Sequence, residues 1–153
     1  MTTIWNPDDM AKAAFHEAGH AVVAWSLCLR VEHIELDLAN NSGHAEIANA
    51  DEVVHQVVIS YAGFEAEEMF KGPAAFVRAE DDFKRAEEDL KNELAQQYLK
   101  DLYSPEGRWL QVTCRECARD WLRMREVQVR RIAEELLNPP NKIDRARFEL
   151  LMR

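Results

Sequence analysis

The sequence predicts a mainly helical α+β domain, a helical bundle with one small β-hairpin. Through most of the chain, apolar residues recur at the three- and four-residue spacing of helices. One segment, residues 31–38, alternates instead and leads into residues typical of turns. The chain has 153 residues, of which 47% are hydrophobic, and contains no repeat or linker, so we expect a single domain over residues 1–153.

The first predicted helix begins at Pro7. Asn6 is a favourable N-cap, Pro7 suits the first helical position, and the two aspartates that follow complement the helix dipole. Trp5 and Met10 have the spacing of a hydrophobic staple. The body of this helix is largely apolar, which predicts that it is buried in the core rather than lying on the surface.

A β-hairpin is predicted after this helix. Residues 31–38 alternate as a half-buried strand, and residues 40–43, Asn-Asn-Ser-Gly, supply turn chemistry. Residues 44–47 can return as the second strand.

The rest of the chain is predicted to be helical. Two runs carry an apolar stripe that we interpret as core: Val54, Val57, Val58, Tyr61 and Ala62 in the first, and Phe83, Ala86, Leu90 and Leu94 in the second. Residues 104–107 break the pattern before a long helix from about residue 108 to residue 137. Residues 138–141 end that helix, and a short one over residues 144–152 can pack back on the bundle.

One motif in the first helix carries chemistry. His16-Glu17-Ala18-Gly19-His20 places two imidazoles four residues apart, so both lie on one helical face and can bind the same metal ion. Glu17 then lies beside the metal, where its carboxylate can take a proton from a water that the metal acidifies and pass it to a leaving amine. The pattern is typical of zinc-dependent peptide hydrolysis. The alternative is a set of hydrogen-bonded core or surface residues, because a pattern this short also recurs by chance.

A catalytic zinc site also needs a third protein ligand that leaves the fourth position to water. Candidate carboxylates lie in residues 65–68, at the end of one helical run, and in residues 80–82, at the start of the next. Charge runs of this kind are usually solvated faces or partners of the helix dipole. The residues alone therefore leave the third ligand open.

Three blocks of the chain resemble the M41 peptidase domain of the FtsH ATP-dependent zinc proteases. They are residues 16–23, which begin HEAGHA; residues 63–72, a glycine, an AEE core and a closing glycine; and residues 82–86, an aspartate that opens D-x-x-x-A. The resemblance extends over about residues 10–152, although only these blocks are specific. It implies an M41 peptidase-like fold in which the hairpin lies next to the metal-site helix and forms an edge beside the metal. An extended peptide could bind to such an edge as an added strand.

The resemblance also implies a role for each site residue. His16 and His20 are expected to be zinc ligands, Glu17 the general base, and Asp82 the third ligand. Asp81 is the adjacent competitor. Glu68 is a weaker candidate, more readily a residue that supports a ligand or packs its helix.

The chain also departs from that family. It contains no G-x-x-x-x-G-K-[ST] phosphate loop and no apolar run of about 20 residues, so we expect a peptidase-like domain standing alone, without ATPase module or membrane anchor. Residues 96–103 lack the Trp-Gly pair usual after the aspartate helix, which leaves the rim of the cleft and the substrate class open.

Composition restricts the partners and the location that we expect. Nineteen basic and 28 acidic residues give a net charge of −9, which argues against nucleic acid and anionic membrane surfaces as partners.

The three cysteines and the absence of leader-like residues at the start predict a cytoplasmic protein with reduced thiols. We expect Cys28 to be core, and Cys114 and Cys117 to form no metal site. His44, on the hairpin, is either a surface residue or a contact to substrate.

Two function classes follow from these observations. The first is a zinc metallopeptidase that works without ATP on flexible peptides or unfolded segments, alone or as a homo-oligomer. The second is a non-catalytic metal-binding interaction module related to FtsH-type proteases. The presence of Glu17 favours the first, because metal binding alone does not require that carboxylate. The missing phosphate loop and the altered residues 96–103 favour the second.

Overall fold

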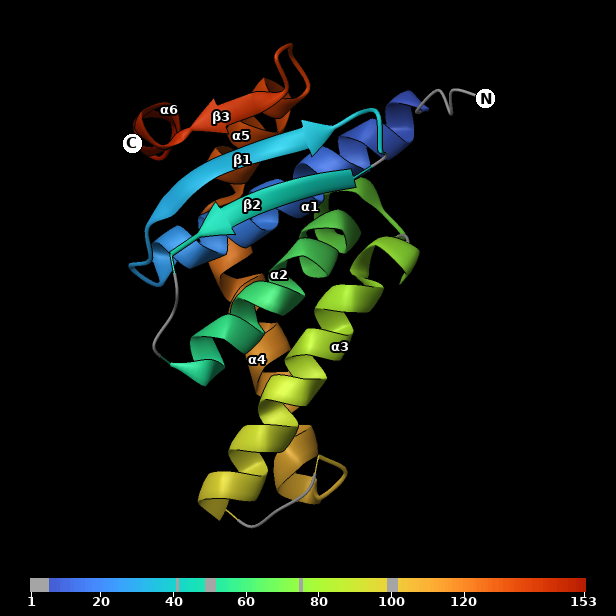
Figure 1. Cartoon of the computed structure of the whole chain (residues 1–153), viewed down its shortest axis with the longest axis vertical. Coiled ribbons are helices and arrows are strands. Elements are labelled where there is room, and N and C mark those ends of the chain that lie inside the picture. The colour runs from blue at the N-terminus through green and yellow to red at the C-terminus, as the bar shows by residue number, and fades with distance from the viewer. Residues whose placement is uncertain (1–5, 41, 49–51, 75, 99–101) are drawn as a thin grey trace.

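The structure is a computed structural model that describes residues 6–40, 42–48, 52–74, 76–98 and 102–153; of residues 76–78, 97 and 98 it describes the backbone alone. In these ranges the order of elements is α1 (Pro7–Ser26), β1 (Val31–Asp37), β2 (Ser42–Ile47), α2 (Val53–Lys71), α3 (Phe76–Glu93), a π-helical turn (Leu94–Tyr98), α4 (Pro105–Met124), α5 (Glu126–Leu136), β3 (Lys142–Asp144) and α6 (Arg145–Leu151). A mostly helical body thus carries one small sheet (Figure 1). This is compatible with the predicted fold class, while the M41-like fold stays a prediction.

Helix α1 is the central element of the core. It begins at Pro7 as predicted, and the side chain of Asn6 caps it by accepting a hydrogen bond from the Asp8 N–H at 2.9 Å. Every residue from Ala13 to Ala24 is buried, which confirms the prediction of a core helix. The predicted staple cannot be followed, because Trp5 lies outside the described residues.

Cys28 is not part of the core, so that prediction is wrong. It is exposed in the turn after α1, where its φ angle of 65° places it in the left-handed region. The turn is required because β1 starts three residues later and runs back along the helix.

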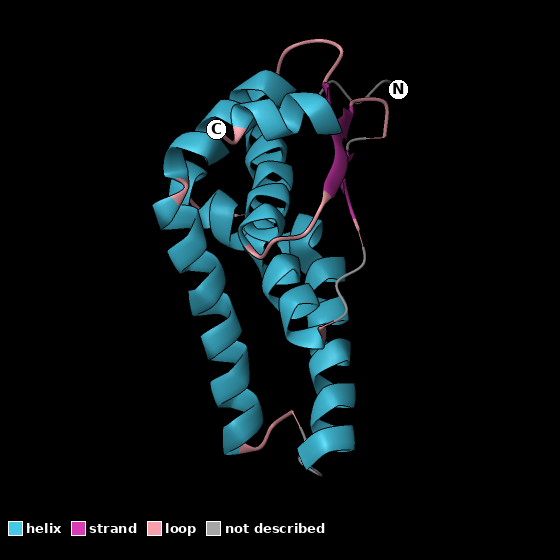
Figure 2. Ribbon diagram, turned by 90° about the vertical axis from the view of Figure 1, so that its left-hand side faces the viewer, coloured by secondary structure: helices cyan, strands magenta, loops and turns pink. Residues whose placement is uncertain are grey.

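The sheet has the strand order β2-β1-β3, with both pairings antiparallel. Its inner face packs on the helices through buried side chains that include Ile34, Leu36 and Ile143, and its outer face is polar. Figure 2 shows the sheet on one side of the helical body. Strand β3 was not predicted, because a three-residue strand is too short to show alternation. Strand β2 has no neighbour on its other side within the described residues.

Helices α1 and α2 pack unusually closely where they cross. A Cβ at Gly19 would lie 2.6 Å from Ala66 Cβ and 2.7 Å from the Ala62 carbonyl oxygen, so no other residue fits there without a shift. The predicted apolar stripe of α2 is buried except for Val54, which lies in the first turn and is 38% exposed. This close packing brings the face of α2 that bears Gly63 directly over the motif of α1.

The next helix, α3, begins at Phe76, before the charge run that was expected to open it. Residues 80–82 therefore lie inside the helix rather than at its first turn. Helix α3 packs on α2 through Phe83, whose ring lies 4.9 Å from the ring of Phe64, and through the buried residues Ala86 and Leu90. This packing fixes which side of α3 faces α1.

The long helix predicted over residues 108–137 is two helices, α4 and α5, which meet at Arg125. Neither glycine nor proline marks the break, and Arg125 leaves the helical region with φ −114° and ψ 22°. Its guanidinium lies 5.1 Å from the ring centre of Trp25 on α1. Packing of α5 on α1 thus overrides the continuous helical pattern in the sequence.

Helices α2 and α4 are joined by a buried carboxylate. Glu65 is fully buried and accepts hydrogen bonds from Arg115 and Arg119, the first at 2.7 Å.

Among the described helices, none is both long enough and apolar enough to cross a membrane.

Candidate metal centre

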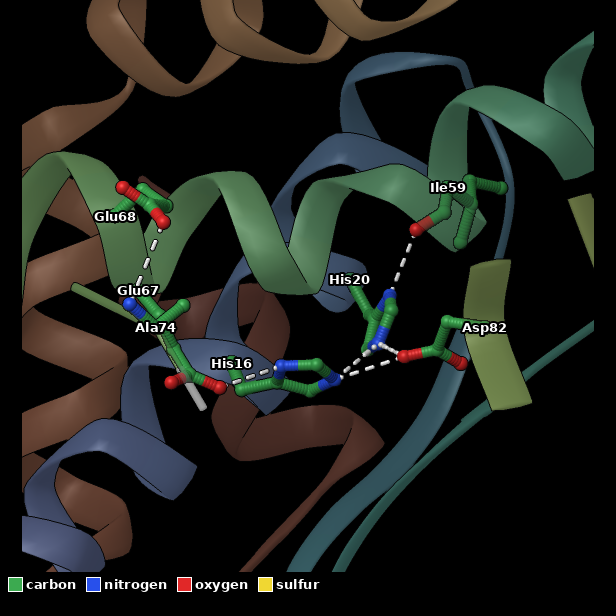
Figure 3. Close-up of polar contacts among 7 residues, drawn as sticks. All are labelled: His16, His20, Ile59, Glu67, Glu68, Ala74 and Asp82. Atoms are coloured by element: carbon green, nitrogen blue, oxygen red, sulfur yellow. Dashed lines mark hydrogen bonds and ion pairs between the residues drawn. The ribbon is translucent and has the colours of Figure 1, made fainter. Parts of the chain in front are cut away.

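Three predicted ligands from two helices meet at one point. Asp82 Oδ2 on α3 lies 2.9 Å from His16 Nε2 and 3.2 Å from His20 Nε2, and the two Nε2 atoms on α1 lie 3.0 Å apart (Figure 3). Within the described part of the chain, these residues form the one group of three or more His, Cys, Asp or Glu side chains that could hold a metal ion.

The other nitrogen of each imidazole is held by α2. His20 Nδ1 donates to the carbonyl oxygen of Ile59 at 2.7 Å, and His16 Nδ1 donates to Glu67 Oε1 at 2.8 Å. Because a carbonyl oxygen and an ionised carboxylate only accept, both Nδ1 atoms carry the hydrogen. In the neutral rings, both Nε2 atoms are then lone-pair acceptors that point at each other and at Asp82.

This arrangement fits a metal ion. With both rings neutral, three acceptor atoms within 3.2 Å of one another repel, and either a proton on His16 or a metal ion between the three atoms removes that repulsion. In a tetrahedral zinc site with bonds of 2.0 to 2.1 Å, ligand atoms are separated by about 3.3 Å, close to the spacing found here. An outer hydrogen bond on each metal-ligating imidazole is also the usual arrangement in such sites.

Gly63 provides the space for the two imidazoles. A Cβ at this position would lie 2.5 Å from His20 Nε2 and 2.6 Å from His16 Nε2. Ile59, Gly63 and Glu67 follow one another at four-residue intervals, so a single face of α2 supports both rings and leaves room between them.

Glu67 is the functional residue that the sequence analysis missed. It is fully buried and bonded to His16, whereas Glu68, the residue named as a candidate, is exposed and accepts from the Ala74 N–H at 3.4 Å. The prediction for Glu68 as a ligand or a ligand's support is therefore wrong in this structure. The spacing Gly63 to Glu67 contained the signal, since it places Glu67 on the glycine face of α2.

Glu17 lines the same cleft as the three predicted ligands but does not belong to their group. It is buried, with 6% of its surface exposed, and lines a cleft of about 600 Å³ together with His16, His20 and Asp82. Gly43 of β2 makes room for it, because a Cβ there would lie 2.6 Å from Glu17 Cγ. Gly43 was predicted as a turn residue, and instead it is part of the strand that walls the cleft.

The adjacent aspartate takes a different position. Asp81 also lines the cleft, but it is exposed and does not join the group formed by His16, His20 and Asp82. Successive residues of a helix point about 100° apart, so only one of the two carboxylates can face both imidazoles.

The charges of the site shift two pKa values strongly. Burial alone lowers the pKa of His16, but its hydrogen bonds to Asp82 and Glu67 and the charge of Glu17 raise the pKa to about 9. Burial raises the pKa of Asp82, yet the two imidazoles hold it well below its usual range. Both shifts have the same meaning: the surrounding carboxylates favour a positive charge at this point, which either a proton or a metal ion can supply.

Zinc is expected to bind more tightly as the pH rises from about 6 to about 9. Binding displaces the proton of His16, so the apparent affinity should rise about tenfold per pH unit until the pKa of about 9 is passed. The raised pKa stabilises the metal-free fold fully below pH 6.5, and this contribution is lost as the pH rises through about 9. Competition with a chelator of known protonation, beside thermal unfolding of the metal-free protein, measures both trends. An affinity that levels off near pH 6.5 would contradict them.

The remaining histidines and cysteines do not join the site. His44 is exposed on β2 at the cleft, where its Nε2 lies 2.7 Å from Glu46 Oε2. Burial raises the pKa of the Cys114 thiol to about 11, which makes it a poor nucleophile and a poor ligand.

Comparison with known families gives a match to a peptidase family. A family model described as Peptidase M50B-like matches residues 1–79 of the 153 residues, a range that includes His16, Glu17, His20 and Glu67 but not Asp82. Among curated proteins, none matches the chain. The matching family differs from the M41 family named in the sequence analysis, so the M41 affiliation stays a prediction. The broader prediction of a metallopeptidase is confirmed: the chain belongs to the Peptidase M50B-like family.

Proposed function

We propose that this protein is a zinc-dependent endopeptidase that cleaves extended peptides or unfolded segments without ATP. The observation that carries the proposal is the convergence of three acceptor atoms, from His16, His20 and Asp82, beside the carboxylate of Glu17. Zinc is proposed because two imidazoles and one carboxylate with an open fourth position form a typical catalytic zinc set. Cobalt, nickel and iron can occupy the same ligands, so the identity of the metal is part of the proposal.

The chain's own residues supply the remaining chemistry. When bound, zinc would polarise the scissile carbonyl and lower the pKa of a water molecule. Glu17 takes the proton from that water and delivers it to the leaving amine. Glu67 and the Ile59 carbonyl keep both imidazoles in the tautomer whose Nε2 atoms face the centre. The buried position of Glu17 in the cleft favours hydrolysis over metal binding alone.

The free edge of β2 offers a binding site for an extended peptide. The backbone N–H of Leu36 in β1 points towards β3, where it donates to the backbone carbonyl oxygen of Asn141 at 2.8 Å. Backbone groups alternate in direction along a strand, so the residues on either side of Leu36 bond to β2, where their partners include His44. Gly43 and Ala45 then direct their N–H and C=O groups to the free edge, which lines the cleft. A peptide added there would run past Glu17.

Cleavage of a flexible substrate tests the proposal. We expect the purified, zinc-loaded chain to cut an unfolded casein-like protein or a fluorogenic peptide equally with and without ATP, because an extended chain can enter the cleft and no phosphate loop is present in the sequence. A stably folded domain should survive the same treatment. Cleavage that requires ATP, or bound zinc without cleavage of any unfolded substrate, would contradict the proposal. The second result would favour the non-catalytic metal-binding module.

A further inference from the structure

The cleft continues along β2 into a second hollow of about 310 Å³. Ala45, Ile47 and Ile59 line both spaces. Gly43 lines only the first, beside Glu17, and Ala48 lines only the second. The combined groove therefore runs along the free edge of β2, from the metal centre towards the carboxyl end of the strand.

Arg85 of α3 lines both of these spaces. It follows Asp82 by three residues on α3, so both side chains lie on the same helical face. Among the described residues that line either space, Arg85 is the only lysine or arginine. Beside three histidines, the first space is lined by four carboxylates, and the chain as a whole carries a net charge of −9.

The surroundings of Arg85 suit a side chain with an aliphatic stem and a charged end. The side chains of Ala45 and Ile47 face inward from β2, because alternate residues of that strand are exposed and half-buried. Together with Ile59 they give the second hollow an apolar floor. The guanidinium group of an arginine binds a carboxylate through two parallel hydrogen bonds. A glutamine amide has only one acceptor oxygen and a lysine ammonium group has none, so neither side chain in a substrate can form this pair.

We propose that Arg85 makes this peptidase select substrates with a carboxylate side chain two or four residues from the scissile bond. The spacing follows from the strand: Ala45 and Ile47, whose side chains face inward, lie two and four positions beyond Gly43, which marks the position of Glu17. The inference rests on the proposed function and names the substrate class for that site. Asp89, one turn further along α3, also interacts with Arg85, so a substrate carboxylate has to compete with it.

Peptide binding tests the role of Arg85 separately from catalysis. Three peptides are acetylated at the amino end and amidated at the carboxyl end. They differ only in having Glu, Gln or Lys at one of the two proposed positions, two or four residues from the scissile bond. Their binding to the zinc-loaded Glu17→Gln protein is measured by fluorescence anisotropy. The Glu peptide should bind about fivefold more tightly than the Gln peptide, as expected for one part-exposed ion pair, and the Lys peptide should bind most weakly.

The matched variants are Arg85→Glu and Lys84→Glu, each in the Glu17→Gln background. Both side chains are exposed and both changes alter the net charge equally, but Lys84 pairs with Glu80 at 2.9 Å and lines neither space. Arg85→Glu should reverse the order so that the Lys peptide binds best, and Lys84→Glu should keep the original order. Equal effects of the two variants, equal binding of the three peptides, or no binding at all would overturn the role of Arg85.

The same peptides separate this inference from the proposed function. If wild type cleaves all three at equal rates and variants at Arg85 change nothing, the selection of carboxylates is wrong while the peptidase stands. If the Glu peptide binds best through Arg85 but no substrate is cleaved by the zinc-loaded wild type, the groove is correct and the peptidase is wrong.

Discussion

Glu17→Gln is expected to lower the rate of peptide cleavage by at least about 100-fold, the usual low end for loss of a general base, while the protein still binds one zinc ion. Glutamine has nearly the same volume and hydrogen-bonding reach as glutamate, but it cannot accept the proton of the attacking water. The shape matters here, because Gly43 of β2 packs so tightly on Glu17 that a Cβ would lie 2.6 Å from its Cγ. The variant should therefore fold and keep the cleft.

Zinc content and cleavage rate have to be measured on the same samples. His16→Ala is the companion variant, because it removes a predicted ligand and should lose the metal together with the activity. If wild type and Glu17→Gln cleave one susceptible peptide at equal rates, Glu17 is not the base. If neither cleaves while both bind zinc, the protein is a binding module.

Asp82→Ala should lower zinc affinity by more than about 100-fold, because loss of a ligand exceeds the 10-fold to 100-fold cost of losing a residue that only supports one. Asp82 is the only carboxylate found within 3.2 Å of both Nε2 atoms in the described residues. Asp81→Ala is the matched control: the same substitution, one residue earlier, at an exposed carboxylate that lines the same cleft.

Chelator competition at one pH measures both variants. We expect Asp81→Ala to keep an affinity close to that of wild type. Exchange of the two results would show that α3 presents the other carboxylate to the imidazoles. Thermal unfolding of the metal-free variants separates loss of a ligand from loss of the fold.

The parts of the site that lie close together in the sequence could be predicted from it. The spacing of His16 and His20 in a helix with a clear amino-terminal cap places both imidazoles on one face, and the structure has them there. The meeting of Asp82 with this face depends on how α3 packs on α2, which no local pattern encodes. It was expected only from the family resemblance.

Glu67 and Gly63 illustrate what the residues alone did not reveal. A glutamate in an AEE run looks like a solvated charge. The four-residue spacing from Gly63 places Glu67 on the glycine face of α2, but its burial against His16 depends on the close crossing of α1 and α2 at Gly19. The break at Arg125 was missed for a similar reason, since helical propensity continues across it and tertiary packing ends the helix.

The predicted cytoplasmic location and the M41 affiliation stay predictions from the sequence.

Anomalous diffraction at the zinc absorption edge, from crystals of the zinc-loaded protein, tests the central claim most directly. We predict one strong peak at about 2.0 to 2.1 Å from His16 Nε2 and His20 Nε2, with an Asp82 oxygen as the third protein ligand and a fourth position open towards Glu17. A peak elsewhere, a ligand set that includes Asp81 or Glu17 in place of Asp82, or a fourth protein ligand that closes the site would contradict the account.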